Sequence, residues 1–103
     1  MGKIKSTVID TKKAVYVVSV ASYYEDNGEL TSYGTAFGTP QEAADWLERD
    51  WNDQAEEFGG KKLTKKAKQE FLRGLTKDIG ISDMESPAEW SAWFTWHAIR
   101  TEI

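Results

Sequence analysis

Residues 14–38 read AVYVVSVASYYEDNGELTSYGTAFG, and this stretch decides the fold class of the chain. Its first half, residues 14–25, is rich in Val and Tyr, which favour strands. Asn27-Gly28 follows, a dipeptide typical of the type I′ hairpin turn because both central positions of that turn need positive φ. Residues 30–38 would then form the returning strand. The stretch therefore predicts a β-hairpin over residues 14–38.

The turn also predicts a register for the hairpin. A two-residue turn at 27–28 places Asp26 opposite Glu29, and every other cross-strand pair follows from that one. In this register one face of the hairpin carries bulky residues, and the other carries small ones such as Ala21 and Gly34. We expect the bulky face to pack on helices. The small face would let a helix or a partner backbone approach closely, or would stay uncovered.

Two amphipathic helices are expected after the hairpin, at about 40–58 and 64–79. The first begins at Thr39-Pro40-Gln41-Glu42, where a capping threonine, a proline at the first helical position and a glutamate form a capping box. Its apolar residues recur at helical spacing, and they are Ala43, Leu47, Trp51, Ala55 and Phe58. Thr64 caps the second helix. The residues expected on its buried face are Ala67, Phe71, Leu72, Leu75 and Ile79.

The two ends of the chain complete the predicted sheet. Residues 4–9 form a short N-terminal strand. Residues 87–91 form a helical turn, and the Trp, Phe, Thr and Ile that follow favour a C-terminal strand, although the spacing of the aromatic residues leaves a helix open. The predicted class is α+β: an antiparallel sheet, made of hairpin 14–38 with an N-terminal and a C-terminal strand, packed against two helices. At 103 residues the chain should be a single domain, 1–103.

Composition excludes several function classes. The chain has no cysteine, which rules out disulfides and thiolate zinc sites and fits a reducing compartment, so we expect the cytoplasm. No apolar run approaches the roughly 20 residues of a membrane span, so no membrane partner is expected. The single histidine, His97, has no recognisable nucleophile motif beside it. We therefore expect no catalytic residues, no metal and no cofactor.

Charge is segregated between the two predicted helices. Residues 40–58 hold seven acids and one base, whereas residues 61–77 hold seven bases and one acid. Most acids of the first helix lie opposite its apolar stripe, as on any solvated face. Trp46 does not fit this pattern, because it lies on the polar side. A tryptophan within a charged face is typical of a binding hot spot, unless another element such as the tail covers that side.

The candidate partner-binding residues share this polar side of the first helix. They are Glu42, Asp45, Trp46, Arg49, Asp50, Asp53 and Glu57. The basic stripe of the second helix, opposite its buried face, is the alternative site. Its members are Lys62, Lys66, Arg73 and Lys77. This stripe is a solvated face in the simplest interpretation. It could also contact phosphates, or pair with the acidic helix within one molecule or between copies in a homo-oligomer.

We expect a small non-enzymatic module that binds a protein with a basic surface. Its most concrete form is an inhibitor or regulator, of the kind carried by phages and mobile elements, whose acidic helix occupies a basic nucleic-acid-binding groove on the target. A nucleic-acid-binding protein that uses the basic stripe with Tyr or Trp stacking is the alternative. The net charge of −4 disfavours it. A small enzyme with a carboxylate base is a third hypothesis.

Overall fold

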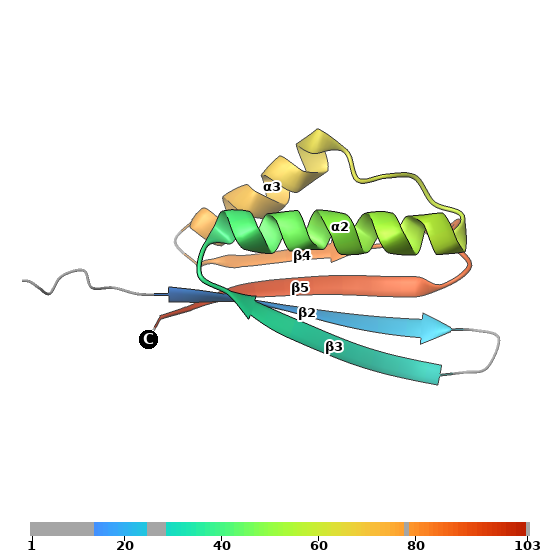
Figure 1. Cartoon of the computed structure of the whole chain (residues 1–103), viewed down its shortest axis with the longest axis horizontal. Coiled ribbons are helices and arrows are strands. Elements are labelled where there is room, and N and C mark those ends of the chain that lie inside the picture. Colours follow the sequence, from blue (N-terminus) through green and yellow to red (C-terminus); the bar gives the residue numbers. More distant parts are fainter. Residues whose placement is uncertain (1–13, 25–28, 78, 103) are drawn as a thin grey trace, which may run out of the picture.

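The computed structural model describes residues 14–24, 29–77 and 79–102. Within these residues four strands and two helices follow one another, and in chain order they are β2 (Ala14–Tyr24), β3 (Glu29–Phe37), α2 (Pro40–Phe58), α3 (Lys65–Thr76), β4 (Ile81–Glu85) and β5 (Trp93–Glu102). Both helices lie on the same side of an antiparallel sheet (Figure 1). The expected α+β class and C-terminal strand are confirmed. The strand expected at residues 4–9 lies outside the described residues.

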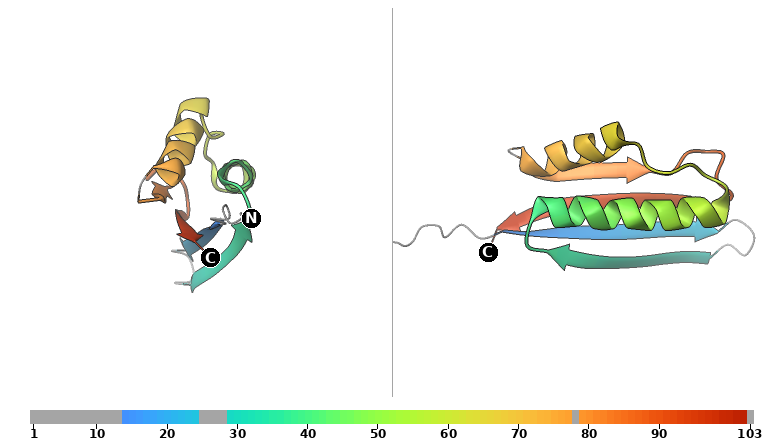
Figure 2. Two further views of the ribbon diagram at one scale, coloured as in Figure 1. Left: turned by 90° about the vertical axis from the view of Figure 1, so that its left-hand side faces the viewer. Right: turned by 45° about the horizontal axis from the view of Figure 1, so that its top comes forward.

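The strand order in the sheet is β3-β2-β5-β4, with every neighbouring pair antiparallel. Figure 2 shows the resulting two layers, with α2 over the β2–β3 side and α3 over the β4–β5 side. The sequence did not predict β4. Its five residues include Ser82, Asp83 and Glu85, so it carries no apolar alternation that would mark a strand. Pairing with β5 makes it a strand, since Ile81 to Glu85 face Ile99 to Thr95.

The hairpin register differs from the prediction by two residues. Tyr24 pairs with Glu29, so four residues, 25–28, lie between the paired positions, and the expected pairing of Asp26 with Glu29 is wrong. Nine cross-strand pairs hold the observed register, one of them reinforced by a 2.7 Å hydrogen bond between the Ser22 and Thr31 hydroxyls. Together such pairs outweigh the preference of one dipeptide for a tight turn. Because the shift is even, each residue keeps its predicted face.

The core lies between the helices and the bulky face of the sheet, as expected. Val18, Val20 and Trp96 of the sheet are fully buried there. Trp51 of α2 lies against Trp96, with 5.0 Å between ring centroids, and against Trp90 at 5.1 Å. The predicted apolar stripe of α2 is confirmed, with Ala43, Leu47, Trp51 and Ala55 buried and Phe58 half-buried.

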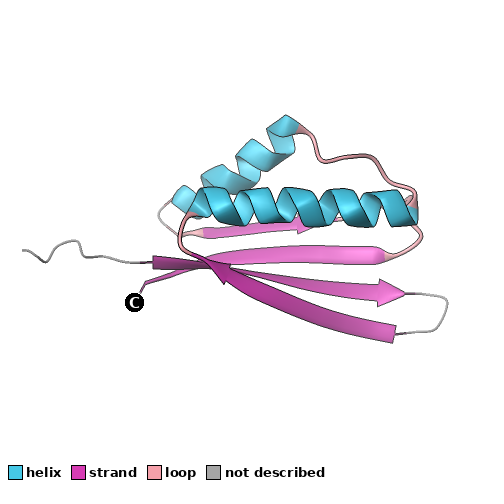
Figure 3. Cartoon of the chain, in the orientation of Figure 1, coloured by secondary structure: helices cyan, strands magenta, loops and turns pink. Residues whose placement is uncertain are grey.

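The prediction that Ile79 is buried is wrong. Ile79 is 75% exposed, because α3 ends at Thr76 and not near residue 79. The helical turn expected at 87–91 is consistent with a backbone bond from Trp90 to the carbonyl of Pro87 at 3.2 Å. Figure 3 shows the loop that then leads into β5. Neither of the described helices combines the length and the apolar content that crossing a bilayer would require.

The face of the sheet turned away from α2 and α3 has no described element over it, and we call it the open face (Figure 1). Strand alternation assigns its residues. They are Val15, Val17, Ser19, Ala21 and Tyr23 of β2, Leu30, Ser32, Gly34 and Ala36 of β3, Ile81, Asp83 and Glu85 of β4, and Trp93, Thr95, His97, Ile99 and Thr101 of β5. Of the three tryptophans in the tail, Trp93 lies here and is 44% exposed, whereas the other two are buried.

Candidate functional site

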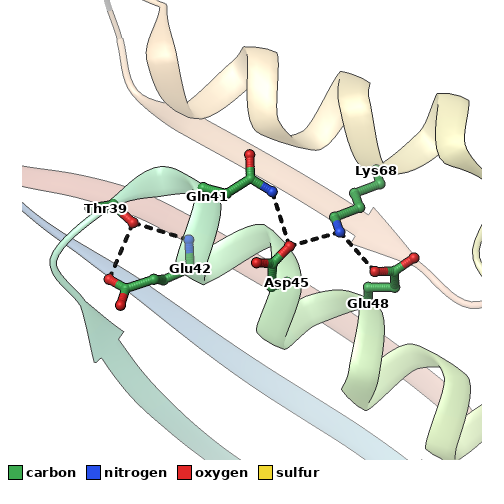
Figure 4. Close-up of polar contacts among 6 residues, drawn as sticks. All are labelled: Thr39, Gln41, Glu42, Asp45, Glu48 and Lys68. Atoms are coloured by element: carbon green, nitrogen blue, oxygen red, sulfur yellow. Dashed lines mark hydrogen bonds and ion pairs between the residues drawn. The ribbon is translucent and has the colours of Figure 1, made fainter.

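The start of α2 is fixed by Thr39, the predicted capping residue, although the Glu42 side chain bonds its hydroxyl and not its backbone N–H. The Thr39 hydroxyl accepts a hydrogen bond from the backbone N–H of Glu42 at 3.1 Å and donates to the Glu42 carboxylate at 3.2 Å (Figure 4). Pro40 occupies the first turn, where its missing N–H has no intrahelical partner to lose. The cap aligns α2 along the sheet and holds the Glu42 side chain at the exposed helix start.

Acidic side chains on one flank of α2 contact α3. Lys68 Nζ lies 2.8 Å from the Asp45 carboxylate and 2.7 Å from that of Glu48, while Gln41 donates to Asp45 at 3.0 Å (Figure 4). The hydrogen bond from Lys68, followed by that from Gln41, lowers the pKa of Asp45 below its usual range. The same bond, with that to Glu48, raises the pKa of Lys68. Asp45 therefore joins the two helices.

This contact pairs the two helices within one molecule, but not through the basic stripe that the sequence analysis considered for such a pairing. The lysine that makes it, Lys68, is outside the expected basic stripe, and its place on the flank facing α2 could not be read from the sequence. The stripe residues are all exposed, and they are Lys62, Lys66, Arg73 and Lys77. Lys66 and Arg73 lie on α3 itself, with Lys62 before the helix and Lys77 directly after it.

Asp50 points from α2 toward the sheet. Its carboxylate accepts hydrogen bonds from the Tyr33 hydroxyl, at 2.8 and 3.0 Å, and from the indole N–H of Trp96, at 2.8 Å. Trp96 is fully buried, so this carboxylate provides the partner that the indole N–H needs. The structure therefore gives Asp50 a role in folding that its position in the acidic pattern did not suggest.

Trp46 is half-buried against strand β3. Its ring centroid lies 6.2 Å from that of Tyr33, in an edge-to-face arrangement, and 6.0 Å from that of Phe37. The element beside Trp46 is thus β3 and not the tail. Tyr33 and Phe37 belong to the bulky face of the hairpin, and the sequence pattern could not connect that face to Trp46. We call these three residues the aromatic strip.

Exposed acids flank the aromatic strip along α2. At 100° per residue, Glu42, Asp53 and Glu57 lie within about 40° of Trp46 around the helix axis. All three are exposed, and we call them the acidic ridge. Asp53 and Glu57 make no ion pair or side-chain hydrogen bond within the described residues. Arg49, also exposed, interrupts the ridge with one positive charge.

Of the seven candidate partner-binding residues, the structure thus brings five to one exposed surface. These are Glu42, Trp46, Arg49, Asp53 and Glu57. The other two make contacts within the fold, Asp45 with α3 and Asp50 with the sheet. Two aromatic neighbours, Tyr33 and Phe37, join the surface from β3.

His97 lies on the open face, where its Nδ1 contacts the Asp83 carboxylate on the next strand. Ser19 faces His97 from the other side, so serine, histidine and aspartate form a row across β2, β5 and β4. The Ser19 hydroxyl, however, donates to the backbone oxygen of His97, at 3.4 Å, and not to its ring. A nucleophilic serine needs the ring nitrogen as its base, so the row is not arranged as a catalytic triad.

The described residues also contain no candidate metal site. No group of three or more His, Asp or Glu side chains in the described residues is arranged to hold a metal ion. No family model matches the chain, and comparisons with curated proteins and with solved structures find no significant match. The functional hypothesis therefore rests on the physical chemistry of the surfaces of the molecule.

Proposed function

We propose that this chain is a non-enzymatic protein-binding module that binds a basic partner surface through the acidic ridge and the aromatic strip. One observation carries the proposal: Trp46, half-exposed beside Tyr33, shares a face of α2 with Asp53 and Glu57, whose carboxylates make no ion pair or side-chain hydrogen bond in the described part of the chain. A partner arginine or lysine could stack on the Trp46 ring while Asp53 and Glu57 neutralise its neighbours. Tryptophan and tyrosine are also the residues enriched in binding hot spots.

The concrete form of the proposal is a cytoplasmic inhibitor or regulator, of the phage or mobile-element kind, that occupies a nucleic-acid-binding groove. A groove that binds phosphates is lined by Lys and Arg, which a row of carboxylates along a helix would match. The nucleic-acid-binding alternative has less support. The exposed aromatic residues of the described chain lie on strands, at Tyr23, Tyr33 and Trp93, and not beside the basic residues of α3, so base stacking and phosphate contact would fall on different surfaces.

The test compares two charge reversals of equal size. Asp53→Lys with Glu57→Lys changes the ridge, and Glu70→Lys with Glu89→Lys changes two exposed acids elsewhere. Each variant and the wild type would be used as bait in a bacterial lysate, with bound proteins identified by mass spectrometry. We expect a basic protein that is retained by the wild type and by the Glu70/Glu89 variant and lost by the ridge variant. Equal retention by all three baits would contradict the proposal.

Trp46→Ala tests the aromatic part of the surface. The ring packs on Tyr33 and Phe37, so we expect some loss of stability, smaller than the 3–5 kcal/mol typical of a fully buried aromatic. Affinity for the captured partner, titrated well below the melting temperature, should fall by about 2 kcal/mol or more. A variant that is less stable but binds the partner with unchanged affinity would limit Trp46 to a packing role. Duplex DNA at about 150 mM salt should not bind the wild type.

A further inference from the structure

The open face contrasts with the rest of the surface in composition. Its apolar side chains include Leu30, which is 69% exposed, Trp93 and Ile99. Tyr23 lies between Leu30 and Trp93 in one cross-strand row, and Ile81, Ile99, Val17 and Ala36 form another row further along the strands. Between these rows lie small residues, which are Ser19, Ala21, Ser32 and Gly34. The face is therefore shallow between two apolar rows on its β2–β3 side, whereas Thr95, His97, Asp83 and Glu85 lie between the same rows on its β4–β5 side.

The ionisable groups of the open face are confined to its β4–β5 side and already have partners within the face. They are Asp83, Glu85 and His97 among the described residues. Asp83 contacts His97, and Glu85 accepts a hydrogen bond from the indole N–H of Trp93 at 2.9 Å. Among the described residues, the two helices carry most of the remaining charge. A chain of net charge −4 can therefore approach a second copy with least repulsion through this face.

The size of the face suits a modest dimer interface. Strands of 11, 9, 5 and 10 residues make it up. At a rise of about 3.4 Å per residue and a spacing of about 4.8 Å, they cover roughly 570 Å² in projection. Side chains standing up from the sheet add relief to this area. The accessible area therefore comes near the roughly 800 Å² that each partner buries in an interface of standard size.

Charge also selects an orientation for two stacked sheets. With a twofold axis parallel to the strands, β2 lies over the partner's β5, and β3 over the partner's β4. Tyr23 then faces the partner's Trp93, while Asp83 and Glu85 lie over the partner's uncharged Gly34 and Ser32. An axis in the sheet plane perpendicular to the strands would instead stack β4 on the partner's β4 and bring Asp83 and Glu85 close to the same two acids, which is repulsive. The first arrangement makes the face complementary to itself, as an isologous interface requires.

We propose that two copies of this chain associate through their open faces into a four-layer helix–sheet–sheet–helix dimer. The sheets pack about 10 Å apart, as in a β-sandwich. This contact differs from the pairing of acidic and basic helices between copies that the sequence suggested. It leaves α2 of each copy on the outside, so the dimer carries two acidic ridges and could bind a repeated basic target with increased avidity. The dimer does not depend on the function of that ridge.

Sedimentation velocity of the full chain, from about 1 to 100 µM at 150 mM salt, tests the proposal. The wild type should form a species of twice the 11.7 kDa chain mass, with a dissociation constant in the micromolar range. Ala36→Glu inserts a charge opposite the partner's β4 and should weaken the dimer at least about thirtyfold. Ala88→Glu makes the same change at an exposed residue outside the sheet and should leave the dimer intact.

Thermal melting followed by circular dichroism would show whether the Ala36→Glu variant remains folded. Trp93→Ala changes an exposed side chain of the same face and should also dissociate the dimer. Cross-linking reports the orientation, because the chain has no cysteine of its own. With Ala36→Cys and Ile81→Cys proteins mixed, a short bismaleimide should join unlike chains more than like chains. If the wild type were monomeric at 100 µM, the proposal would be wrong, and any partner of the open face would have to be a different protein. Persistence of the dimer in both Ala36→Glu and Trp93→Ala would overturn it as well.

Discussion

Replacing Asp50 by alanine should destabilise the fold far more than the same replacement at Asp53, one turn away on α2. The Asp50 carboxylate is the acceptor for the indole N–H of fully buried Trp96, at 2.8 Å, and for the Tyr33 hydroxyl. Leaving a buried donor without a partner costs about 1–3 kcal/mol. Tyr33 is exposed, so losing the hydrogen bond from its hydroxyl to Asp50 adds only about 0.5 kcal/mol or less.

The expected free energy loss for Asp50→Ala from these two hydrogen bonds is therefore about 1–3.5 kcal/mol. Alanine is a better helix former than aspartate by up to about 0.7 kcal/mol, and this gain offsets part of the loss at both positions. The difference between the Asp50 and Asp53 variants thus isolates the hydrogen bonds. Asp53 is exposed, so its variant should lie within about 0.5 kcal/mol of wild type.

Urea unfolding followed by far-UV circular dichroism measures both variants, with thermal melting as a second readout. A loss of 2 kcal/mol corresponds to a fall of about 8–16 °C in melting temperature for a domain of this size. Asp50→Asn keeps an oxygen that can accept from Trp96 and should be intermediate. If Asp50→Ala were as stable as Asp53→Ala, the carboxylate would not be the partner that the indole requires, and the structural role assigned to it would be wrong.

Two further predictions concern the contact between Asp45 of α2 and Lys68 of α3, and the close packing of Gly60 against Trp90. The pKa of Asp45 is lower in the folded than in the unfolded chain, so the stability from its contact with Lys68 is complete above about pH 4 and is lost as the pH falls through the folded-state value. Lys68→Met should therefore reduce the free energy of unfolding in urea at pH 7 by about 1 kcal/mol or less, and by less as the pH falls through the folded-state pKa of Asp45. Gly60→Ala would place Cβ in steric overlap with the indole ring of buried Trp90 and should cost about 1–3 kcal/mol of stability, measured by the same unfolding curves. Gly38→Ala, whose Cβ would meet no atom closer than 3.8 Å, is the matched control and should change stability little.

The predicted Asp50 effect alters how the acidic helix should be tested. Reversing the charge of Asp50 would disturb the fold as well as any interface, because the carboxylate is bonded to the sheet. Asp45 has the same difficulty through Lys68. Asp53 and Glu57 are free of such contacts within the described residues and separate binding from folding.

Signals that act over one turn or one strand were predicted well from the sequence. The helix cap at Thr39 and the apolar stripe of α2 lie where the pattern placed them, because each depends on residues three or four positions apart. The division of hairpin residues into a bulky and a small face also held, since alternation survives an even shift in register. The predicted register was wrong, because Asn27-Gly28 indicates only a local preference for a tight turn, whereas strand pairing is determined along the whole hairpin.

Within the candidate site, the sequence determined which residues carry charge and that Trp46 departs from the amphipathic pattern. Tertiary structure alone decided which contacts those residues make within the fold, because their partners come from distant parts of the chain. Trp46 meets Tyr33 and Phe37 of β3, Asp50 meets Trp96 of β5, and Lys68 joins Asp45 from α3. Tertiary structure also decided that residues 81–85 form a strand, because these largely polar residues are held in a strand by pairing with β5. Hydrogen bonds and ring contacts act over a few ångströms in space, and a one-dimensional pattern does not record which distant residues come within that range.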